Sequence, residues 1–336
     1  MEQKELSHNK NKNMFYKNLI FATVLLSLNA CNKDDVTTPT TTTLEIKVDA
    51  SNFLTSTGSV VITTENRTLS NGTTVQCYKI VTKNNPADHT MGPWCPTNIS
   101  DDATKGGIWL SGGNVYDVDG AFVKNLATFY NDATWQMYNT STGAITKTLT
   151  QADCEAAANP NVGAAYKNYC VECLPSYVSS ITNTYYIPVT PIKLTTSYTF
   201  PTGPGGPGGA TGPSSRGIAF DGVVFDAPAP VNVILAAYTL APFDDYGGHI
   251  NPNAGYHYHA ATGLTKKITQ TDGHAAMIGY AMDGFGIYER LSAAGTEYTD
   301  LDANRGHTDD VRGYHYHVDK AGNNNFINGL AGAYAQ

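Results

Sequence analysis

Histidines at alternate positions of a short repeated word are the strongest chemical signal in this sequence. The word Gly-Tyr-His-Tyr-His occurs at residues 255–259 and again at residues 313–317. Its two copies supply four of the nine histidines of the chain: His257, His259, His315 and His317. Histidine is the commonest protein metal ligand, so metal binding is the first chemistry that this pattern indicates.

The spacing of these histidines has a geometric meaning in a β-strand. Tyrosine favours strands, in which successive side chains point to opposite faces. His257 and His259 would then share one face, and the tyrosines between them would pack or donate hydrogen bonds on the other. Imidazoles two residues apart start about 6.5–7 Å apart at Cα and can tilt toward one ion. If the two words face each other across strands or packed sheets, all four imidazoles converge on one site.

Other potential ligands lie close to the two words. The C-terminal third holds three more histidines: His249, His274 and His307. Carboxylates beside imidazoles either bind the metal or orient the second ring nitrogen, and we select three: Asp283, Asp302 and Asp309. A role in turns stays open as the alternative for these aspartates. His89, in a loop far upstream, is a more distant candidate, with simple solvation as its alternative.

The ligand types restrict the metal. Imidazole-rich sites with few thiolates suit copper, zinc, iron or nickel, whereas calcium prefers oxygen ligands. We expect copper or zinc. Zinc with an open position would activate water, and copper would support redox chemistry with the tyrosines as electron relays. The sequence contains no Gly-x-Ser-x-Gly, His-Glu-x-x-His or P-loop motif that would indicate a hydrolase or nucleotide enzyme.

Three functions therefore stay open. The first is binding of a transition metal through the paired words. The second is a metal-dependent hydrolase or oxidase that uses the same site. The third is a binding or adhesion module, for a small-molecule or protein ligand that the sequence does not identify, in which histidines and tyrosines form a structural network.

Segments around the words resemble a known family. They are residues 86–93, residues 278–288 and the Leu301-Asp302 pair before the second word. Together with the first Tyr-His-Tyr-His they make the chain similar to the YHYH domain family of bacterial secreted or surface proteins, from about residue 80 onward. The chain departs from the family at Gly286, where proline is usual. The resemblance implies a fold family and names no reaction.

The N-terminus has the features of a targeting signal. Lysines precede an apolar run at residues 19–28, and Ala30-Cys31 follows. The run is too short to cross a bilayer core of about 30 Å, and the order of regions is that of a secretory signal. Met14 is an alternative start for this signal.

Cys31 and the residues after it predict a membrane anchor. The segment 28–31 resembles a bacterial lipobox, in which the cysteine carries lipid, and residues 32–35 (Asn-Lys-Asp-Asp) resemble the surface-export signal of Bacteroidetes lipoproteins. We expect an outer-membrane lipoprotein exposed at the cell surface, touching the membrane only through its lipid. An ordinary secreted protein is the alternative.

Composition bounds the rest of the chain. Its formal charge is −8, and residues 1–30 carry four lysines and two glutamates, so the remainder is near −10. This balance, without a basic cluster, argues against nucleic-acid partners. We divide the chain into a signal peptide (1–30), a lipidated threonine-rich tether (31–43) and a β-rich domain (44–336). Within the domain, the motif core spans 216–330 and a possible insertion spans 150–175.

Short alternating runs and turn pairs predict the fold class. We expect strands at 44–48, 60–62, 77–81 and 185–200, with hairpin turns at Asn71-Gly72 and Asp221-Gly222. Short helices are expected near 121–130 and after Thr150, whereas 231–240 has mixed signals. The domain is therefore mainly β, with two packed sheets, long loops and a few short helices.

The cysteines point to disulfides, because thiols outside the cell are normally oxidised. Five remain besides Cys31: Cys77, Cys95, Cys154, Cys170 and Cys173. We expect Cys77 to pair with Cys95, and Cys154 to pair with either Cys170 or Cys173, which leaves one thiol free.

Overall fold

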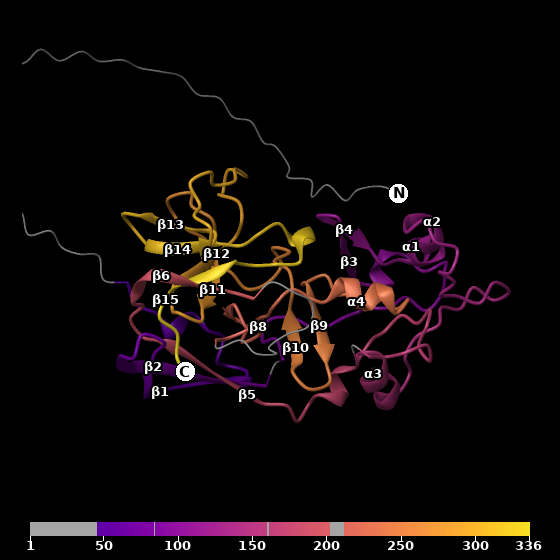
Figure 1. Cartoon of the computed structure of the whole chain (residues 1–336), viewed down its shortest axis with the longest axis horizontal. Coiled ribbons are helices and arrows are strands. Elements are labelled where there is room, and N and C mark those ends of the chain that lie inside the picture. The colour runs from indigo at the N-terminus through magenta and orange to yellow at the C-terminus, as the bar shows by residue number, and fades with distance from the viewer. Residues whose placement is uncertain (1–45, 84, 160, 202–211) are drawn as a thin grey trace, which may run out of the picture. The chain divides into compact units, whose positions relative to one another are not determined.

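The structure is a computed structural model that describes residues 46–83, 85–159, 161–201 and 212–336 (Figure 1). The predicted signal peptide, Cys31, the predicted tether and the first residues of the strand expected at 44–48 lie outside the described residues. Leu44–Gln336 forms one compact unit. Within the described ranges, no helix has the length and apolar character that a membrane span requires.

The described chain is mainly β with short helices, as predicted. The helices are α1 (Gly120–Lys124), α2 (Leu126–Phe129), α3 (Gln151–Ala157) and α4 (Val231–Ala236), with 3-10 turns at Ala50–Asn52, Ala103–Lys105, Pro175–Tyr177 and Ala321–Asn323. The first strands are β1 (Val60–Thr68), β2 (Thr74–Thr82), β3 (Ile108–Ser111), β4 (Asn114–Asp117), β5 (Asn183–Pro188) and β6 (Lys193–Thr199). The later strands are β7 (Gly217–Ala219), β8 (Val224–Phe225), β9 (Gly248–Asn251), β10 (Gly255–Tyr258), β11 (Met277–Ala281), β12 (Gly286–Tyr288), β13 (Gly306–Asp309), β14 (Gly313–His317) and β15 (Gly329–Gly332).

One large sheet carries both histidine words. Its strand order is β13-β14-β12-β11-β7-β8-β10-β9, and smaller sheets are β1-β2-β5, β15-β6 and β3-β4. The three-stranded sheet packs on the large one, because Val60 and Ile187 share a buried cluster with Ile218 and Phe225. Packed sheets were expected, and this shared core provides them.

The large sheet consists of two copies of one four-stranded unit. β7, β8, β10 and β9 form the first copy, and β11, β12, β14 and β13 form the second in the same order. The copies meet where β7 and β11 pair antiparallel, with Gly217 opposite Ala281 and Ala219 opposite Gly279. In each copy the strand with the histidine word runs parallel to the second strand of an Asp-Gly hairpin. The repeat is thus much longer than the five-residue word.

The Asp-Gly turns fix these hairpins. Gly222 and Gly284 have φ of +91° and +87°, a backbone region that L residues with side chains rarely adopt. The predicted Asp221-Gly222 turn is confirmed, since it joins β7 to β8, and Asp283-Gly284 joins β11 to β12 in the same way.

Local predictions elsewhere are mostly confirmed. Asn71-Gly72 lies in the β1–β2 hairpin, and α3 begins after Thr150, whose side chain forms a capping box with Asp153. The mixed segment 231–240 begins as α4. The strand predicted at 44–48 is wrong over residues 46–48, which form no strand, although Val48 is buried. Alternation alone therefore indicated burial there. The Val48 backbone nitrogen donates to the Val189 carbonyl at 2.9 Å, and the segment forms no strand.

The disulfides correct one predicted pairing. Cys154 pairs with Cys173, one of the two partners expected, and the Cα atoms lie 5.4 Å apart. The predicted Cys77–Cys95 pair is wrong: Cys95 pairs with Cys170 across 75 residues, and Cys77 is a buried free thiol in β2. Cys77 belongs to a small hydrophobic cluster with Leu69 and Ala333, whereas Cys95 lies in the cluster that contains Trp109 and Phe243.

We predict that removal of the Cys95–Cys170 bridge lowers the free energy of unfolding by about 4 kcal/mol, and removal of Cys154–Cys173 by about 3 kcal/mol. The larger effect is expected for the longer loop, 75 residues against 19, because more chain freedom returns to the unfolded state. Denaturant unfolding of the paired Cys→Ala variants measures both. Cys77→Ala is the control for loss of a buried sulfur. Equal unfolding of wild type with and without reductant would contradict the prediction.

Candidate metal centres

Three histidines of the first unit form one cluster. His249 lies on β9 directly opposite His257 on β10, and His259 follows β10. The rings lie close, with centroids 4.7 to 4.9 Å apart. His257 and His259 are 4% and 5% exposed. The strand alternation predicted for the first word therefore places both of its imidazoles on one buried face, beside a third.

Backbone carbonyls fix these rings. The Nδ1 atoms of His257 and His259 lie 2.9 Å and 2.6 Å from the carbonyl oxygens of Gly255 and Ala227, and the His249 ring bonds to the Ala241 backbone. A carbonyl oxygen only accepts hydrogen bonds, so each such Nδ1 carries the hydrogen. The Nε2 of a neutral ring is then a bare lone pair, and His259 Nε2 lies 3.2 Å from His249 Nε2.

Four histidines of the second unit form a matching cluster. His307 on β13 lies opposite His315 on β14, His317 ends β14, and His274 comes from the segment before β11. Nδ1 of His315 lies 2.9 Å from the Gly313 carbonyl, and Nδ1 of His317 lies 2.8 Å from that of Glu289. These two contacts repeat those of the first word.

The other two rings of this cluster are also fixed through Nδ1. His307 bonds to Asp300 Oδ2 at 2.9 Å, and His274 lies 3.1 Å from the Ala275 carbonyl. The Nε2 atoms again face one another. They are 2.9 Å apart for His307 and His315, 3.0 Å for His274 and His315, and 3.2 Å for His307 and His317.

Such facing lone pairs repel unless a proton or a cation lies between them. Imidazole nitrogens that share a metal at 2.0–2.1 Å are themselves about 2.9 to 3.4 Å apart, for square-planar to tetrahedral angles. The observed separations fall in this range. Metal-bound histidines also normally donate their second ring hydrogen to a carbonyl or carboxylate, as these rings do. The donor sets therefore fit a transition metal.

The charge state of the rings suits the same role. Burial lowers the pKa of His249 and His259 well below 6.5. It lowers the pKa of His315 to about 4 and that of His317 to about 3. These imidazoles are neutral at pH 7, which is the form that binds metals.

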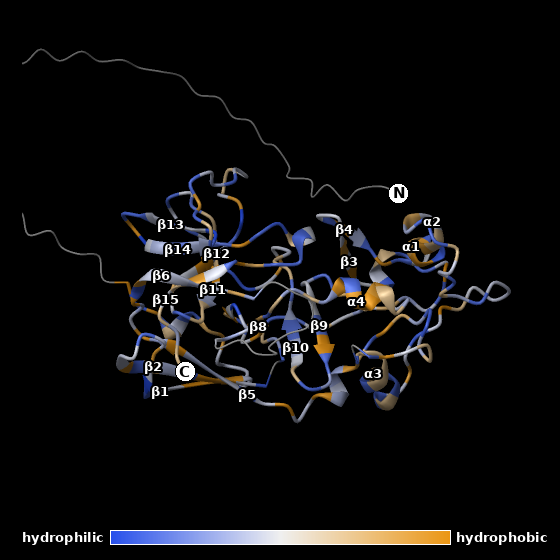
Figure 2. Cartoon of the chain, in the orientation of Figure 1, coloured by the Kyte–Doolittle hydropathy of each residue, from blue (hydrophilic) through white to orange (hydrophobic). Residues whose placement is uncertain are grey.

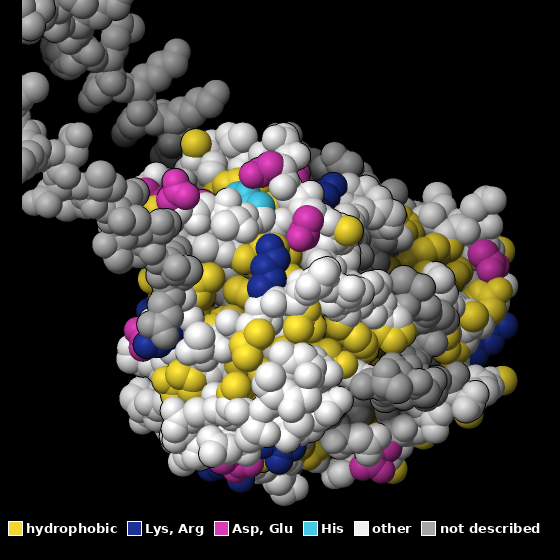
Figure 3. All heavy atoms as spheres, turned by 60° about the vertical axis from the view of Figure 1, so that its left-hand side comes forward, with side chains coloured by type: hydrophobic (Ala, Val, Ile, Leu, Met, Phe, Trp, Pro, Cys, Tyr) yellow, Lys and Arg dark blue, Asp and Glu magenta, His cyan; other side chains and the backbone are white. Residues whose placement is uncertain are grey.

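The hydropathy of β10, which carries the first histidine word, contrasts with its burial. β10 is coloured as hydrophilic in Figure 2, although all of its residues are buried. Buried polar side chains are costly unless they are paired or bind a ligand. On the face drawn in Figure 3, only a small histidine surface is visible, and several acidic side chains lie near it.

The tyrosines occupy the opposite face of each word and are held by carboxylates. Tyr256 donates to Asp244 at 2.7 Å and Tyr258 to Asp221 at 2.6 Å. In the second unit, Tyr314 donates to Asp302 at 2.8 Å and Tyr316 to Asp283 at 2.6 Å. Each unit thus has an imidazole face and a tyrosine–carboxylate face.

Two of these carboxylates also position the outer strand. Asp244 Oδ1 accepts from the backbone nitrogens of Tyr246 and Gly248, and Asp302 Oδ1 accepts from those of Asn304 and Gly306. Because Gly248 and Gly306 immediately precede His249 and His307, each carboxylate connects the tyrosine face to an imidazole of the cluster.

The predicted aspartates have roles other than direct contact with the rings. Asp283 and Asp302 bind tyrosines, and Asp309 pairs with Arg312 at 2.5 Å. Within the two clusters, the carboxylate that holds an imidazole is Asp300, which contacts His307. Sequence reasoning missed Asp300, and it also missed Asp221 and Asp244, which bind tyrosines. Alignment of the two units would have identified Asp221 and Asp244 as the equivalents of Asp283 and Asp302.

His89 belongs to neither imidazole cluster. Its side chain is 3% exposed, so the solvated alternative is wrong. Its Nδ1 lies 2.6 Å from Asp88 Oδ1, and its ring stacks on Tyr246 at 3.5 Å. His89, Asp88 and Asp221 form a third group of possible ligand atoms on the tyrosine face, and this group has one imidazole only.

The expectation of a single shared site is wrong. β10 and β14 are separated in the sheet by β8, β7, β11 and β12, and Figure 1 shows the two words in different parts of the domain. Five steps of about 4.8 Å place the strands about 24 Å apart. Two separate centres replace the one centre expected, because each word finds its partner histidine on its own hairpin.

We predict that Asp283→Asn weakens the pH dependence of stability. Burial raises the pKa of Asp283 to about 6, so the folded protein keeps this proton to a higher pH than the unfolded chain, where the value is about 3.9. As pH rises from about 4 to about 6, this group lowers the free energy of unfolding by about 2 to 3 kcal/mol. In the variant, the free energy of unfolding does not undergo this decrease. Urea unfolding at pH 4 and pH 7 measures the difference.

The exposed Asp310 supplies the matched control. Asp310→Asn makes the same chemical change at the surface and retains the wild-type difference between the two pH values. An Asp283→Asn protein with the wild-type difference would show that this carboxyl does not titrate as stated.

Comparison with known proteins gave one family match. Residues 184–300 match the family model described as YHYH protein. This match contains β7 to β12 and the first histidine word, and it is narrower than the resemblance expected from residue 80 onward. No curated protein and no solved structure matched the chain. The predicted resemblance to the YHYH family is therefore supported over residues 184–300.

Proposed function

We propose that this protein binds two transition-metal ions, copper or zinc, one at each imidazole cluster. The observation that carries the proposal is the set of Nε2 atoms 2.9 to 3.2 Å apart. Each of these rings also bonds to a carbonyl or carboxylate of the chain. When bound, the metal would supply positive charge that these lone pairs share, and the chain's carbonyls would orient the rings toward it.

A purely structural histidine network has less support. Such a network would pair each ring nitrogen with a donor or an acceptor. Among the clustered rings, Asp300 on His307 is the one carboxylate partner that the described hydrogen bonds contain, and the Nε2 atoms face one another. The arrangement satisfies one nitrogen of each ring and leaves the second for a cation.

We also propose that the protein is an outer-membrane lipoprotein displayed at the cell surface. The support is the sequence of residues 19–35, with its apolar run, Ala30-Cys31 and Asn-Lys-Asp-Asp. An anchor of this kind would hold the metal centres outside the cell, where contact with the membrane occurs through the lipid alone.

We predict two equivalents of metal in untagged protein, measured by elemental analysis after equilibration with Cu(II) or Zn(II) and desalting. His257→Ala/His259→Ala retains one equivalent, His315→Ala/His317→Ala retains the other, and the quadruple variant retains none. At free metal of about 100 times the Kd, each ion stabilises the fold by about 2.7 kcal/mol. Thermal unfolding with and without EDTA measures that effect.

His89→Ala is the matched control, because it removes a buried histidine outside both clusters. It keeps both equivalents. Wild-type protein that retains no metal, or a melting temperature that EDTA leaves unchanged, would refute the proposed function.

We predict that Cys31→Ala moves the protein from the membrane fraction to the soluble fraction. Without the thiol there is no attachment point for lipid, and incorporation of labelled palmitate is lost. Cys77→Ala, which removes another cysteine, leaves the protein in the membrane fraction. Protease treatment of intact cells tests surface display, and protection of the wild-type domain would argue against it.

A further inference from the structure

A cavity reaches one imidazole cluster and not the other. It has a volume of about 290 Å³, and His249, His257 and His259 are among its lining residues. None of the described residues that line it belongs to the four-histidine cluster. The two centres, alike in their strands, therefore differ in whether this cavity borders them.

The cluster that borders the cavity also has fewer imidazoles than the other cluster. The second cluster has His274 as its fourth member, and the first has three histidines. Proteins use four ligands to close structural zinc sites, and three ligands where a position must stay open to water or substrate.

Aromatic rings pack on the second cluster, although the side chains of His274 and His307 stay partly exposed. The Tyr298 ring lies 3.9 Å from that of His317 and 5.1 Å from those of His274 and His307, and Tyr288 lies 4.9 Å from both His274 and His315. In the first cluster, Phe243 packs against His249 and His259 at 4.9 and 5.3 Å, while the cavity borders all three rings.

On this basis, and resting on the metal binding proposed above, we propose that the three-histidine centre is a ligand-binding centre and the four-histidine centre is structural. The cavity beside the first centre admits a small, neutral, largely apolar molecule that donates one lone pair to the metal.

The side chains that line the cavity determine this class of ligand. Apolar side chains from three segments line the cavity: Val162, Val171, Pro230, Val233, Ile234 and Ala237. Two carboxylates, Glu172 and Asp226, line it too, and no lysine or arginine is among its described lining residues. Lys147 pairs with Glu172 at 2.5 Å, so Asp226 is the carboxylate that disfavours an anionic ligand. The volume is near the lower end for small-molecule pockets, about 300 to 1,000 Å³.

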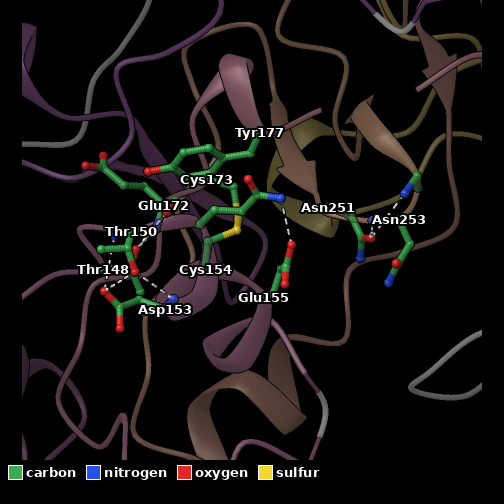
Figure 4. The surroundings of a disulfide bond; sticks show 12 residues. Thr148, Thr150, Asp153, Cys154, Glu155, Glu172, Cys173, Tyr177, Asn251 and Asn253 are labelled. Atoms are coloured by element: carbon green, nitrogen blue, oxygen red, sulfur yellow. Dashed lines mark hydrogen bonds between the residues drawn. A yellow bond between two sulfur atoms is a disulfide. The ribbon is translucent and has the colours of Figure 1, made fainter. Parts of the chain in front are cut away.

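The predicted insertion supplies one of these walls. Figure 4 shows the Cys154–Cys173 disulfide beside Glu172, with Asn251 of β9 across from it. Glu172, Cys173 and Asn251 all line the cavity. The two disulfides therefore fasten a wall of the first centre, which gives the segment 150–175 a function in ligand access.

The test uses cobalt(II), whose visible spectrum reports its coordination, in proteins that keep one centre each. Imidazole and 4-phenylimidazole are the probes. In His315→Ala/His317→Ala, which keeps the three-histidine centre, we expect a saturable spectral change with both. 4-Phenylimidazole binds at least about fivefold tighter than imidazole, because its phenyl group enters the apolar cavity. Benzoate, an anion of similar size, binds more weakly than 4-phenylimidazole.

The four-histidine centre is expected to bind neither probe. In His257→Ala/His259→Ala, the cobalt spectrum is unchanged by either probe, because the coordination positions are filled. An equal response at both centres, or no response at a cobalt-loaded three-histidine centre, overturns the inference and leaves metal binding intact. Failure of either cluster to take up cobalt in the wild type overturns both proposals.

A variant of the wall tests the cavity without altering a histidine. Val233→Trp, made in the otherwise wild-type chain, fills the space next to the centre. It should retain two equivalents of cobalt and lose at least about tenfold in affinity for 4-phenylimidazole. Ala236→Trp is the matched control, because Ala236 is exposed on the same helix and is not a lining residue. Equal affinity in the two variants would show that the ligand does not enter this cavity.

Discussion

The hydrogen bond from a histidine Nδ1 to a protein oxygen, made by six of the seven clustered rings, is the interaction on which both centres depend. It selects the tautomer, and it turns Nε2 toward the neighbouring rings. His257 and His315 use the carbonyl of the glycine two residues earlier. Those glycines, Gly255 and Gly313, have φ of +83° and +62°, a conformation that strains other residues. The glycine that begins each word is therefore part of the ligand geometry.

The two-residue period of a strand then gives each word two separate roles. One face presents imidazoles, and the other presents tyrosines to buried carboxylates. A tyrosine–carboxylate pair satisfies both partners inside the protein, and an imidazole cluster leaves lone pairs that only a proton or cation satisfies. Asp244 and Asp302 connect the faces, since each binds a tyrosine and the backbone just before a clustered histidine. The tyrosine–carboxylate face thus holds the imidazole face in position.

Sequence reasoning predicted what local geometry controls. Alternation placed His257 and His259 on one face, and Asp221-Gly222 predicted its turn. Strand order is not local, so the words were expected to share a site that the sheet separates. The carbonyl that fixes His259 belongs to Ala227, 32 residues away, and Cys95 pairs across 75 residues. No pattern in the sequence indicates such partners. The duplication of the four-stranded unit, in contrast, is visible in the sequence. Asp-Gly, Gly-His and Gly-Tyr-His-Tyr-His follow one another in the same order in each unit, and the prediction used only the last of these words.

Duplication allows one motif to serve the two functions proposed for it. The paired strands and their carbonyls are equivalent in both units, so they do not distinguish the centres. The segments that connect the hairpins do. Residues 226–247 contribute α4 and Phe243 to the first centre, and residues 289–305 contribute Tyr298 and Asp300 to the second. Because strands must keep their register while connections tolerate change, the unit can retain its clustered histidines while the connecting segment changes what surrounds them.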